Sequence, residues 1–206
     1  MSKLVVLLTM SLDGFVAGPN RSPGHGLGEH GGPHLFDWYF SGKEPHPRFS
    51  AFKPEGANML VMDKRFGEVG AILAGRNTYE NARGWNGTHP INAVPIVVLT
   101  HEAPKEPPRG FSQMIFVNDL TRAIAEAKVL AGGKTVAITG TSVAQQCLRA
   151  GHVDELWLTI VPLVLGDGKR LFDGIGDDAI PLEKIEVVDG PHATHVTYRV
   201  PHGGHG

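Results

Sequence analysis

The sequence predicts an α/β protein with a mostly parallel central sheet, because short β-branched segments alternate with helical patterns along most of its 206 residues. Several strand-like segments are apolar on both faces, which is typical of central strands that are covered on both sides. The last one, THVTYRV, alternates polar and apolar residues as a late antiparallel or edge strand does. We therefore expect antiparallel strands at the C-terminal end of the sheet. The strand-like segments span residues 3–10, 71–75, 95–100, 114–117, 135–139, 155–161 and 194–200.

One segment between these strands has both the periodicity and the end signals of a helix. Residues 119–131 begin at a capping residue, Asp119, and end at the pair Gly132-Gly133. An apolar stripe at helical spacing would face the core. The stripe consists of Leu120, Ile124, Ala127 and Ala131.

A second helix is predicted over residues 142–150. Ser142 and Gln145 have the spacing of a capping box, and Val143 and Cys147 would face inward. The single cysteine excludes an internal disulfide and a multi-cysteine metal cage. In a helical segment it is more typical of a small buried hydrophobic residue than of a nucleophile.

The overall length and charge limit the possible functions. The chain is long enough for one substantial core and has no obvious linker, so we expect a single domain over residues 1–200 and a tail at 201–206. A formal net charge of −2 without a basic run argues against nucleic-acid binding. No apolar run approaches the ~20 residues of a membrane-spanning helix, and the chain opens without a signal-peptide pattern. These features favour a cytoplasmic protein without a membrane or nucleic-acid partner.

Residues 18–56 are rich in glycine, proline and histidine, unlike the rest of the chain. A segment of this length between strands usually forms a lid or a binding loop, here with one short helix around residues 35–40. Its aromatic run, FDWYF at 36–40, could stack on a planar heterocycle or form the packing core of the loop. The histidines lack the fixed spacing of strong zinc signals, so no metal site is predicted. They are His25, His30, His34 and His46.

Two glycine-rich matches to nucleotide-binding motifs have the wrong context. Residues 26–31, GLGEHG, match the GxGxxG pattern but neither follow a strand nor open a helix. Residues 133–135, GKT, resemble the end of a P-loop, but Lys128 stands where the first glycine is required. We therefore interpret neither segment as a phosphate-binding motif.

Three polar segments follow strand-like runs, where open α/β sheets bind their ligands. Arg76 could make a forked contact to one phosphate, and the amides of a helix that begins near Thr141 could hold a second. This pattern suits a doubly phosphorylated cofactor. The alternative is that Arg76 is a surface charge and that the threonines and serine are ordinary caps. The segments are Gly75-Arg76-Asn77-Thr78, Thr100-His101 and Thr139-Gly140-Thr141-Ser142.

The order of these motifs resembles the dihydrofolate reductase superfamily. Within it, the chain is similar to the C-terminal reductase domain of the bifunctional riboflavin-biosynthesis deaminase/reductase. The resemblance covers nearly the whole chain and implies a three-layer α/β/α fold, a bound NADPH and a homodimer. The segments that carry it are SLDGF (11–15), GAILAGRNTYE (70–80), PIVVLTH (95–101), TGTSVAQQCLRAGHVDELWLTIVPLVLGDGKRLF (139–172) and THVTYRV (194–200).

The resemblance also implies which residues meet the cofactor. Gly75, Arg76 and Thr78 would contact its phosphates, with the arginine favouring the 2′-phosphate, and Thr100 and His101 would lie nearby. The pyrophosphate and nicotinamide would meet Thr139, Gly140, Thr141, Ser142 and Val143. The nicotinamide pocket would be bordered by Ser11, Asp13, Gly14, Ala17 and Gly18. One departure is Thr139, which replaces the first of two glycines that in the family are often joined by a cis peptide.

Two carboxylates are candidates for the catalytic acid. Dihydrofolate reductases place a carboxylate in the substrate pocket on the first helix, and Asp37 is at a comparable place here. Its alternative role is that of a solvated carboxylate at a helix start. Asp13 in SLDG is the second candidate, although an aspartate before a glycine more often forms a turn.

These observations lead to three functional hypotheses. The first is an NADPH-dependent reductase of a small heterocyclic or carbonyl-type substrate, with its pocket between the first strand, the 18–56 segment and the loop GDGKRLF. The second is the riboflavin-pathway pyrimidinone reductase proper, whose substrate phosphate could meet Lys169 and Arg170. The third is a nucleotide-binding protein without turnover, or a histidine-rich metal-sequestering module. The cofactor could also be NADH or a deazaflavin. For the dimer, residues 155–165 could supply an apolar interface, although they also fit a central strand.

Overall fold

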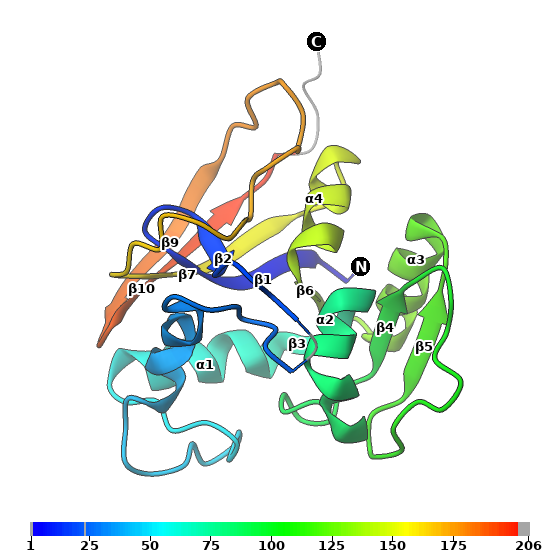
Figure 1. Cartoon of the computed structure of the whole chain (residues 1–206), viewed down its shortest axis with the longest axis horizontal. Helices are drawn as coiled ribbons and strands as arrows, with labels where there is room; N and C mark the ends of the chain where they lie inside the picture. Colours follow the sequence, from blue (N-terminus) through cyan, green and yellow to red (C-terminus); the bar gives the residue numbers. More distant parts are fainter. Residues whose placement is uncertain (1, 23, 202–206) are drawn as a thin grey trace.

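The computed structural model describes residues 2–22 and 24–201, and the predicted tail therefore lies outside the described residues except for its first member. A central sheet of eight strands runs in the order β5-β4-β3-β6-β1-β7-β10-β9 (Figure 1). The first five neighbouring pairs of this order are parallel, whereas β10 is antiparallel to both β7 and β9. The predicted mostly parallel sheet with antiparallel C-terminal strands is thus confirmed.

The strands of the central sheet begin and end close to the predicted positions, except β9, which the sequence did not predict. Those of the central sheet are β1 (Leu4–Ser11), β3 (Val69–Gly75), β4 (Ile96–Leu99), β5 (Met114–Val117), β6 (Thr135–Thr139), β7 (Glu155–Val161), β9 (Glu183–Gly190) and β10 (Ala193–Arg199). A small second sheet pairs β2 (Phe15–Ala17) with β8 (Lys169–Arg170). Because β7 lies between β1 and β10, the apolar run at 155–161 is a central strand of the sheet. Homodimer formation stays a prediction.

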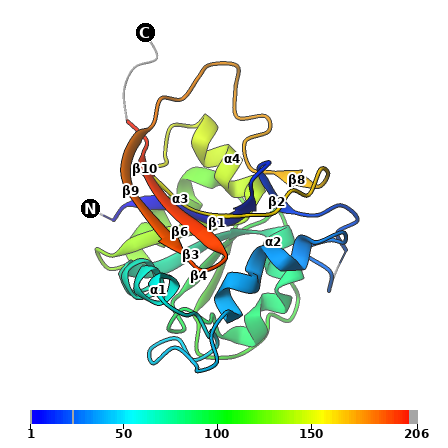
Figure 2. The ribbon, with the colours of Figure 1, turned by 90° about the vertical axis from the view of Figure 1, so that its left-hand side faces the viewer.

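Helices cover both faces of the sheet, which gives three layers (Figure 2). One face packs against α3 (Leu120–Leu130) and α4 (Thr141–Arg149), and the other against α1 (Ala57–Glu68) and η1 (Gly32–Phe40). Two short helical segments, α2 (Arg76–Asn81) and η2 (Arg83–Gly87), follow β3. Alternation along β1 divides its side chains between the two cores, with Leu4 and Val6 in one and Val5 in the other. Among the described residues no helix is both long and apolar enough to span a bilayer.

The start of α3 is as predicted, whereas that of α4 is not. The Asp119 carboxylate accepts a hydrogen bond from the Arg122 amide, which is the expected N-cap. The capping box at Ser142 and Gln145 is wrong: Gly140 is the N-cap, and no described side chain caps α4. The Gln145 amide instead donates to the carbonyls of Arg170 and Leu171, because tertiary contacts place that loop beside the helix. Cys147 is buried as expected, and burial raises the pKa of its thiol to about 12.

Candidate functional site

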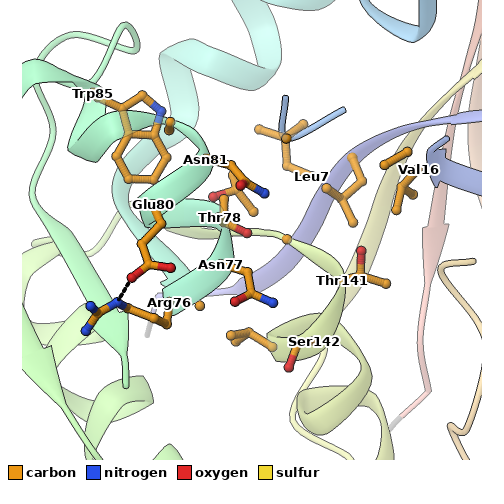
Figure 3. Close-up of a pocket in the computed structure, with 18 of the residues that line it drawn as sticks. Leu7, Val16, Arg76, Asn77, Thr78, Glu80, Asn81, Trp85, Thr141 and Ser142 are labelled. Carbon is orange, nitrogen blue, oxygen red and sulfur yellow. Dashed lines mark hydrogen bonds and ion pairs between the residues drawn. The ribbon is translucent and has the colours of Figure 1, made fainter. Parts of the chain in front are cut away.

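A cavity of about 1130 Å³ opens at the carboxyl ends of β3, β4 and β6 and along the middle of β1. The end of β3 contributes Gly75, the end of β4 Leu99, and the end of β6 Thr139. Figure 3 shows α2 residues Arg76, Asn77 and Thr78 on one side of the cavity, across from Ser142 and Thr141 of α4. The parallel strand order produces this arrangement, because neighbouring strands that run the same way end at the same edge.

The structure brings most of the predicted cofactor residues together around this cavity. Those that line it are Ala17, Gly75, Arg76, Thr78, Thr100, His101, Thr139, Gly140, Thr141, Ser142 and Val143. Ser11 and Gly18 do not line it. The Ser11 hydroxyl is buried and donates to Asp13 while it accepts from the Phe15 amide, so it stabilises the turn between β1 and β2. The Gly18 amide donates to the Leu27 carbonyl, which closes the loop that follows β2.

Arg76 opens α2 directly after β3 and is held by two acceptors. Its Nε donates to the Glu80 carboxylate one turn later (Figure 3). Its Nη1 donates to the backbone carbonyl of Glu102. The same carbonyl accepts from the Thr100 hydroxyl at 2.9 Å. Nη2 makes no hydrogen bond to any described residue, and the guanidinium remains about one third exposed. Arg76 is therefore preorganised with donors to spare for an anion.

The turn between β6 and α4 has the features of a cradle for a ligand. A Cβ added at Gly140 would come within 2.1 Å of the Thr78 hydroxyl oxygen, and the φ of Gly140 is +110°. The Thr139 Oγ1 is buried without a hydrogen-bond partner among the described residues. The first-turn amides of α4, which no described side chain caps, lie beside it. An orphaned hydroxyl and uncapped amides at one end of a cavity fit the oxygen atoms of a phosphorylated cofactor. The Thr139–Gly140 bond is trans, as are the other peptide bonds of the described residues.

Gly140→Ala is expected to lower the free energy of unfolding by about 2 kcal/mol, because the new methyl group meets Thr78 and the backbone conformation disfavours a side chain. Urea denaturation monitored by circular dichroism measures this change. Gly151→Ala is the matched control, since Gly151 also has a positive φ, +66°, but nothing lies within 4 Å of its added Cβ. Equal losses for the two variants would show that the contact with Thr78 is unimportant.

Asp13 does not reach the cavity and holds the loop after β7. Its carboxylate accepts from the amides of Leu165 at 3.1 Å and Gly166 at 2.7 Å, as well as from the Ser11 hydroxyl. Slight burial raises the pKa of Asp13, but these hydrogen bonds outweigh it and lower the pKa to about 2. Arg170 donates to the Asp13 carbonyl and lies over the Phe15 ring. Asp13 thus connects the turn between β1 and β2 to the loop after β7 and to β8, which is a positioning role.

Asp37 lies on the outer side of η1. Its carboxylate is exposed and contacts the His34 ring nitrogen at 2.8 Å. It is not among the cavity-lining residues, whereas its neighbours Phe36, Tyr39 and Phe40 are. The structure therefore does not bring Asp37 together with the predicted cofactor residues.

The aromatic run of η1 serves as both a packing core and a cavity wall. Trp38 is buried, stacks on Tyr39 with ring centroids 3.9 Å apart, and donates from Nε1 to the Thr9 hydroxyl. Tyr39 stacks in turn on Phe52. Tyr39, Phe40, Phe52 and Thr9 all line the cavity. Burial raises the pKa of Tyr39, so its hydroxyl stays protonated.

His89 and Trp85 are cavity residues that the sequence analysis missed. The His89 ring is buried, its Nδ1 accepts from the Ile91 amide, and its centroid lies 5.0 Å from that of Trp85. Nε2 therefore carries the proton and is a fixed donor, and it makes no hydrogen bond to a described residue. Burial lowers the pKa of His89 to about 3, so the ring stays neutral. No local motif marks either residue.

The loop histidines act locally, and within the described chain no three histidine, cysteine or acidic side chains form a metal-binding group. His34 contacts Asp37 and His30 lies near Glu29. His46 is buried, and its Nδ1 accepts the amides of Arg48 and Phe49. These contacts order the segment between β2 and α1.

The RibD C-terminal domain family model matches residues 2–195, almost the whole chain. The chain belongs to this family. A curated relative, the uncharacterized protein YwjB of Bacillus subtilis, is 24% identical over 173 residues, which are 82% of each protein. The resemblance on which the sequence analysis relied is therefore confirmed at the level of the family.

Solved structures show the same fold. A putative riboflavin biosynthesis protein from Shewanella sp. PV-4 superimposes with a TM-score of 0.66 at 23% identity, covering 98% of this chain and 99% of the other. Dihydrofolate reductase from Enterococcus faecalis, solved with NADP(H), superimposes with a TM-score of 0.57 at 15% identity, covering 96% of both chains. At these identities the similarity shows the fold, which is dihydrofolate reductase-like. The ligands of this chain must be inferred from the chemistry of its own site.

Proposed function

We propose that this RibD C-terminal domain is an NADPH-dependent reductase that transfers hydride to a small heterocyclic or carbonyl-type substrate. The observation that carries the proposal is that one cavity joins two chemically different ends. At one end, polar groups that could bind phosphate lie at the ends of β3, β4 and β6, and at the other the cavity is lined by aromatic rings from η1 and its neighbours. Such a cavity suits a phosphorylated cofactor beside a flat organic substrate.

The polar end offers groups for the phosphates of the proposed cofactor. Arg76 would bind the 2′-phosphate, with Thr100 and His101 beside it. The α4 amides, Ser142 and the unpartnered Thr139 hydroxyl would bind the pyrophosphate oxygens. Gly75 and Gly140 let the ends of β3 and β6 pack closely against α4 and α2, since side chains there would meet Val143 and Thr78. When bound, NADPH supplies a hydride from its nicotinamide ring.

The aromatic end would hold the acceptor of that hydride. Tyr39, Phe40, Phe52 and Trp85 offer flat apolar surfaces, and the neutral His89 offers an Nε2–H donor for a carbonyl oxygen or ring nitrogen.

The riboflavin-pathway reduction itself is a second candidate. Two further cationic side chains, Arg21 and Lys169, line the cavity and could contact a substrate phosphate. Arg170, the other sequence candidate, is engaged with Asp13 and Phe15. The names of the structural relatives include riboflavin biosynthesis, and a phosphorylated pyrimidinone is therefore included among the substrates to be tested.

Titration with NADPH is expected to stabilise the protein and to quench its tryptophan fluorescence. At a concentration 100 times Kd, the stabilisation is about 2.7 kcal/mol, or roughly 5–10 °C in Tm. Trp85 lines the cavity and would transfer excitation energy to the reduced nicotinamide. Oxidation of NADPH, monitored by absorbance with pyrimidinone, dihydrofolate and quinone-type acceptors, then identifies the substrate class.

The outcomes of this titration separate the hypotheses. No thermal or fluorescence response to NADPH or NADH would contradict the proposed cofactor. Binding without NADPH oxidation by any acceptor would favour a nucleotide-binding protein without turnover.

A further inference from the structure

The cavity wall that would meet the 2′-phosphate contains a carboxylate as well as an arginine. Glu80 lies one helical turn after Arg76 on α2, lines the same cavity, and forms an ion pair with the guanidinium Nε (Figure 3). Both side chains are partly exposed, with relative accessibilities of 36% for Arg76 and 43% for Glu80. The positive charge offered to an anion is therefore already partly neutralised by Glu80.

The remaining hydrogen bonds of Arg76 restrict where an anion can bind. Nε faces Glu80 and Nη1 faces the Glu102 carbonyl, which leaves the Nη2 side for a ligand. A phosphate there would bind the same guanidinium as the Glu80 carboxylate, so the two anionic groups would lie on either side of it and repel each other. A ribose 2′-hydroxyl at the same position would carry no charge, and a nearby carboxylate could accept its proton in a hydrogen bond.

From this geometry, and resting on the proposed function, we infer that Glu80 determines the coenzyme specificity of the site. Its carboxylate weakens binding of a 2′-phosphate relative to a 2′-hydroxyl. Arg76 attracts the 2′-phosphate of NADPH, and Glu80 limits how strongly this phosphorylated dinucleotide is preferred over NADH. The pair thus sets the selectivity between NADPH and NADH.

The expected size of the effect follows from the repulsion between Glu80 and the phosphate. For a dianion about 6 Å from a carboxylate in water, Coulomb's law at low salt corresponds to roughly a 10-fold change in affinity. Screening at 0.15 M ionic strength reduces this to roughly 3-fold. Removal of the Glu80 charge also removes an ion pair that positions Arg76, which would weaken phosphate binding. This opposing effect on affinity is smaller, because exposed ion pairs four residues apart on a helix stabilise weakly. Removal of the Glu80 charge should therefore tighten NADPH binding.

The test compares Glu80→Gln with the wild-type chain in dinucleotide affinity at 10 mM and 150 mM salt. The ratio of NADH to NADPH Kd is expected to rise about 10-fold at low salt and about 3-fold at high salt, with NADH itself changed less than 2-fold. Adenosine 2′,5′-bisphosphate and 5′-AMP, used as fragments, should show the same difference. Glu80→Ala, checked by thermal unfolding, serves as a second variant.

Glu126→Gln is the matched control. Glu126 forms the same type of ion pair with Arg122, at 3.9 Å on α3, and does not line the cavity. The Glu126→Gln substitution therefore removes one negative charge without changing the site. A similar gain in both variants would mean that net charge alone is responsible and would overturn the inference. Unchanged selectivity in Glu80→Gln, with NADPH still bound by the wild type, would overturn the inference but not the proposed function. If the wild type binds neither dinucleotide, both fall.

Discussion

Arg76→Ala is expected to weaken NADPH binding by about 30- to 100-fold while it changes NADH binding by less than about 3-fold. The guanidinium is the cationic group at the junction of β3, α2 and the Glu102 carbonyl, and it is held there before any ligand arrives. Its removal takes away a charge-assisted contact to the phosphate and leaves the Glu80 carboxylate unneutralised beside it. Both consequences act on the 2′-phosphate and neither acts on a neutral 2′-hydroxyl.

Isothermal titration of both dinucleotides against Arg76→Ala measures this selectivity directly. Arg122→Ala removes an arginine from the equivalent surface pair on α3 and should leave both affinities unchanged. Equal weakening of NADPH and NADH by Arg76→Ala would mean that the arginine supports the α2 backbone rather than a 2′-phosphate contact. The two variants at positions 76 and 80 should therefore shift selectivity in opposite directions.

Acidification from pH 7 to pH 4 is expected to destabilise the protein by on the order of 5 kcal/mol, because two buried histidines must be protonated on unfolding. Burial lowers the pKa of His89 to about 3, and burial together with Arg65 lowers that of His195 to about 4. An unfolded histidine titrates near 6.5. Below that pH the unfolded state binds more protons than the folded state, so stability is complete above about 6.5 and is lost as the pH falls towards the folded pKa values.

The environment of His195 explains why its ring stays neutral in the folded protein. Its Nε2 contacts Asn58 Oδ1 and its Nδ1 contacts the Thr159 hydroxyl, both at 2.9 Å. The Asn58 Nδ2 donates to the Pro191 carbonyl at 2.9 Å, which fixes the amide so that Oδ1 faces the ring. Nε2 is therefore the protonated nitrogen, and Thr159 donates to Nδ1. Protonation of this fully buried ring would place a charge beside the buried Arg65.

Urea unfolding at intervals between pH 4 and pH 8 measures the slope of stability against pH. Each histidine should contribute up to about 1.4 kcal/mol per pH unit below pH 6, so His195→Gln and His89→Gln should each flatten the slope. The exposed His192, in the turn before β10, provides His192→Gln as a control that should leave the slope unchanged. A stability that is the same at pH 7 and pH 4 would contradict the prediction.

Much of the fold follows from local sequence signals. The β-branched runs and the Asp119 cap are read correctly because hydrophobic periodicity and end-capping depend on residues a few positions apart. Local sequence signals do not predict α1 or β9. The strand β9 is mostly exposed at the edge of the sheet, so it has no continuous apolar run, and its place is set by its pairing with β10. In α1 the buried side chain of Arg65 donates hydrogen bonds to the carbonyls of Leu158 and Val196. A charged residue on the inner face interrupts the apolar pattern by which a helix is predicted.

For the candidate site, the strand ends that meet at the cavity can be predicted from the sequence, because a glycine and an arginine after a buried strand are local features. The other features of the site follow from tertiary contacts. The tertiary structure placed Asp13 under the loop after β7, directed Asp37 outward from η1, and brought His89 into the cavity. Each of these depends on contacts between residues far apart in the chain, whose geometry is fixed when the two cores pack against the sheet and not by the spacing of the residues along it.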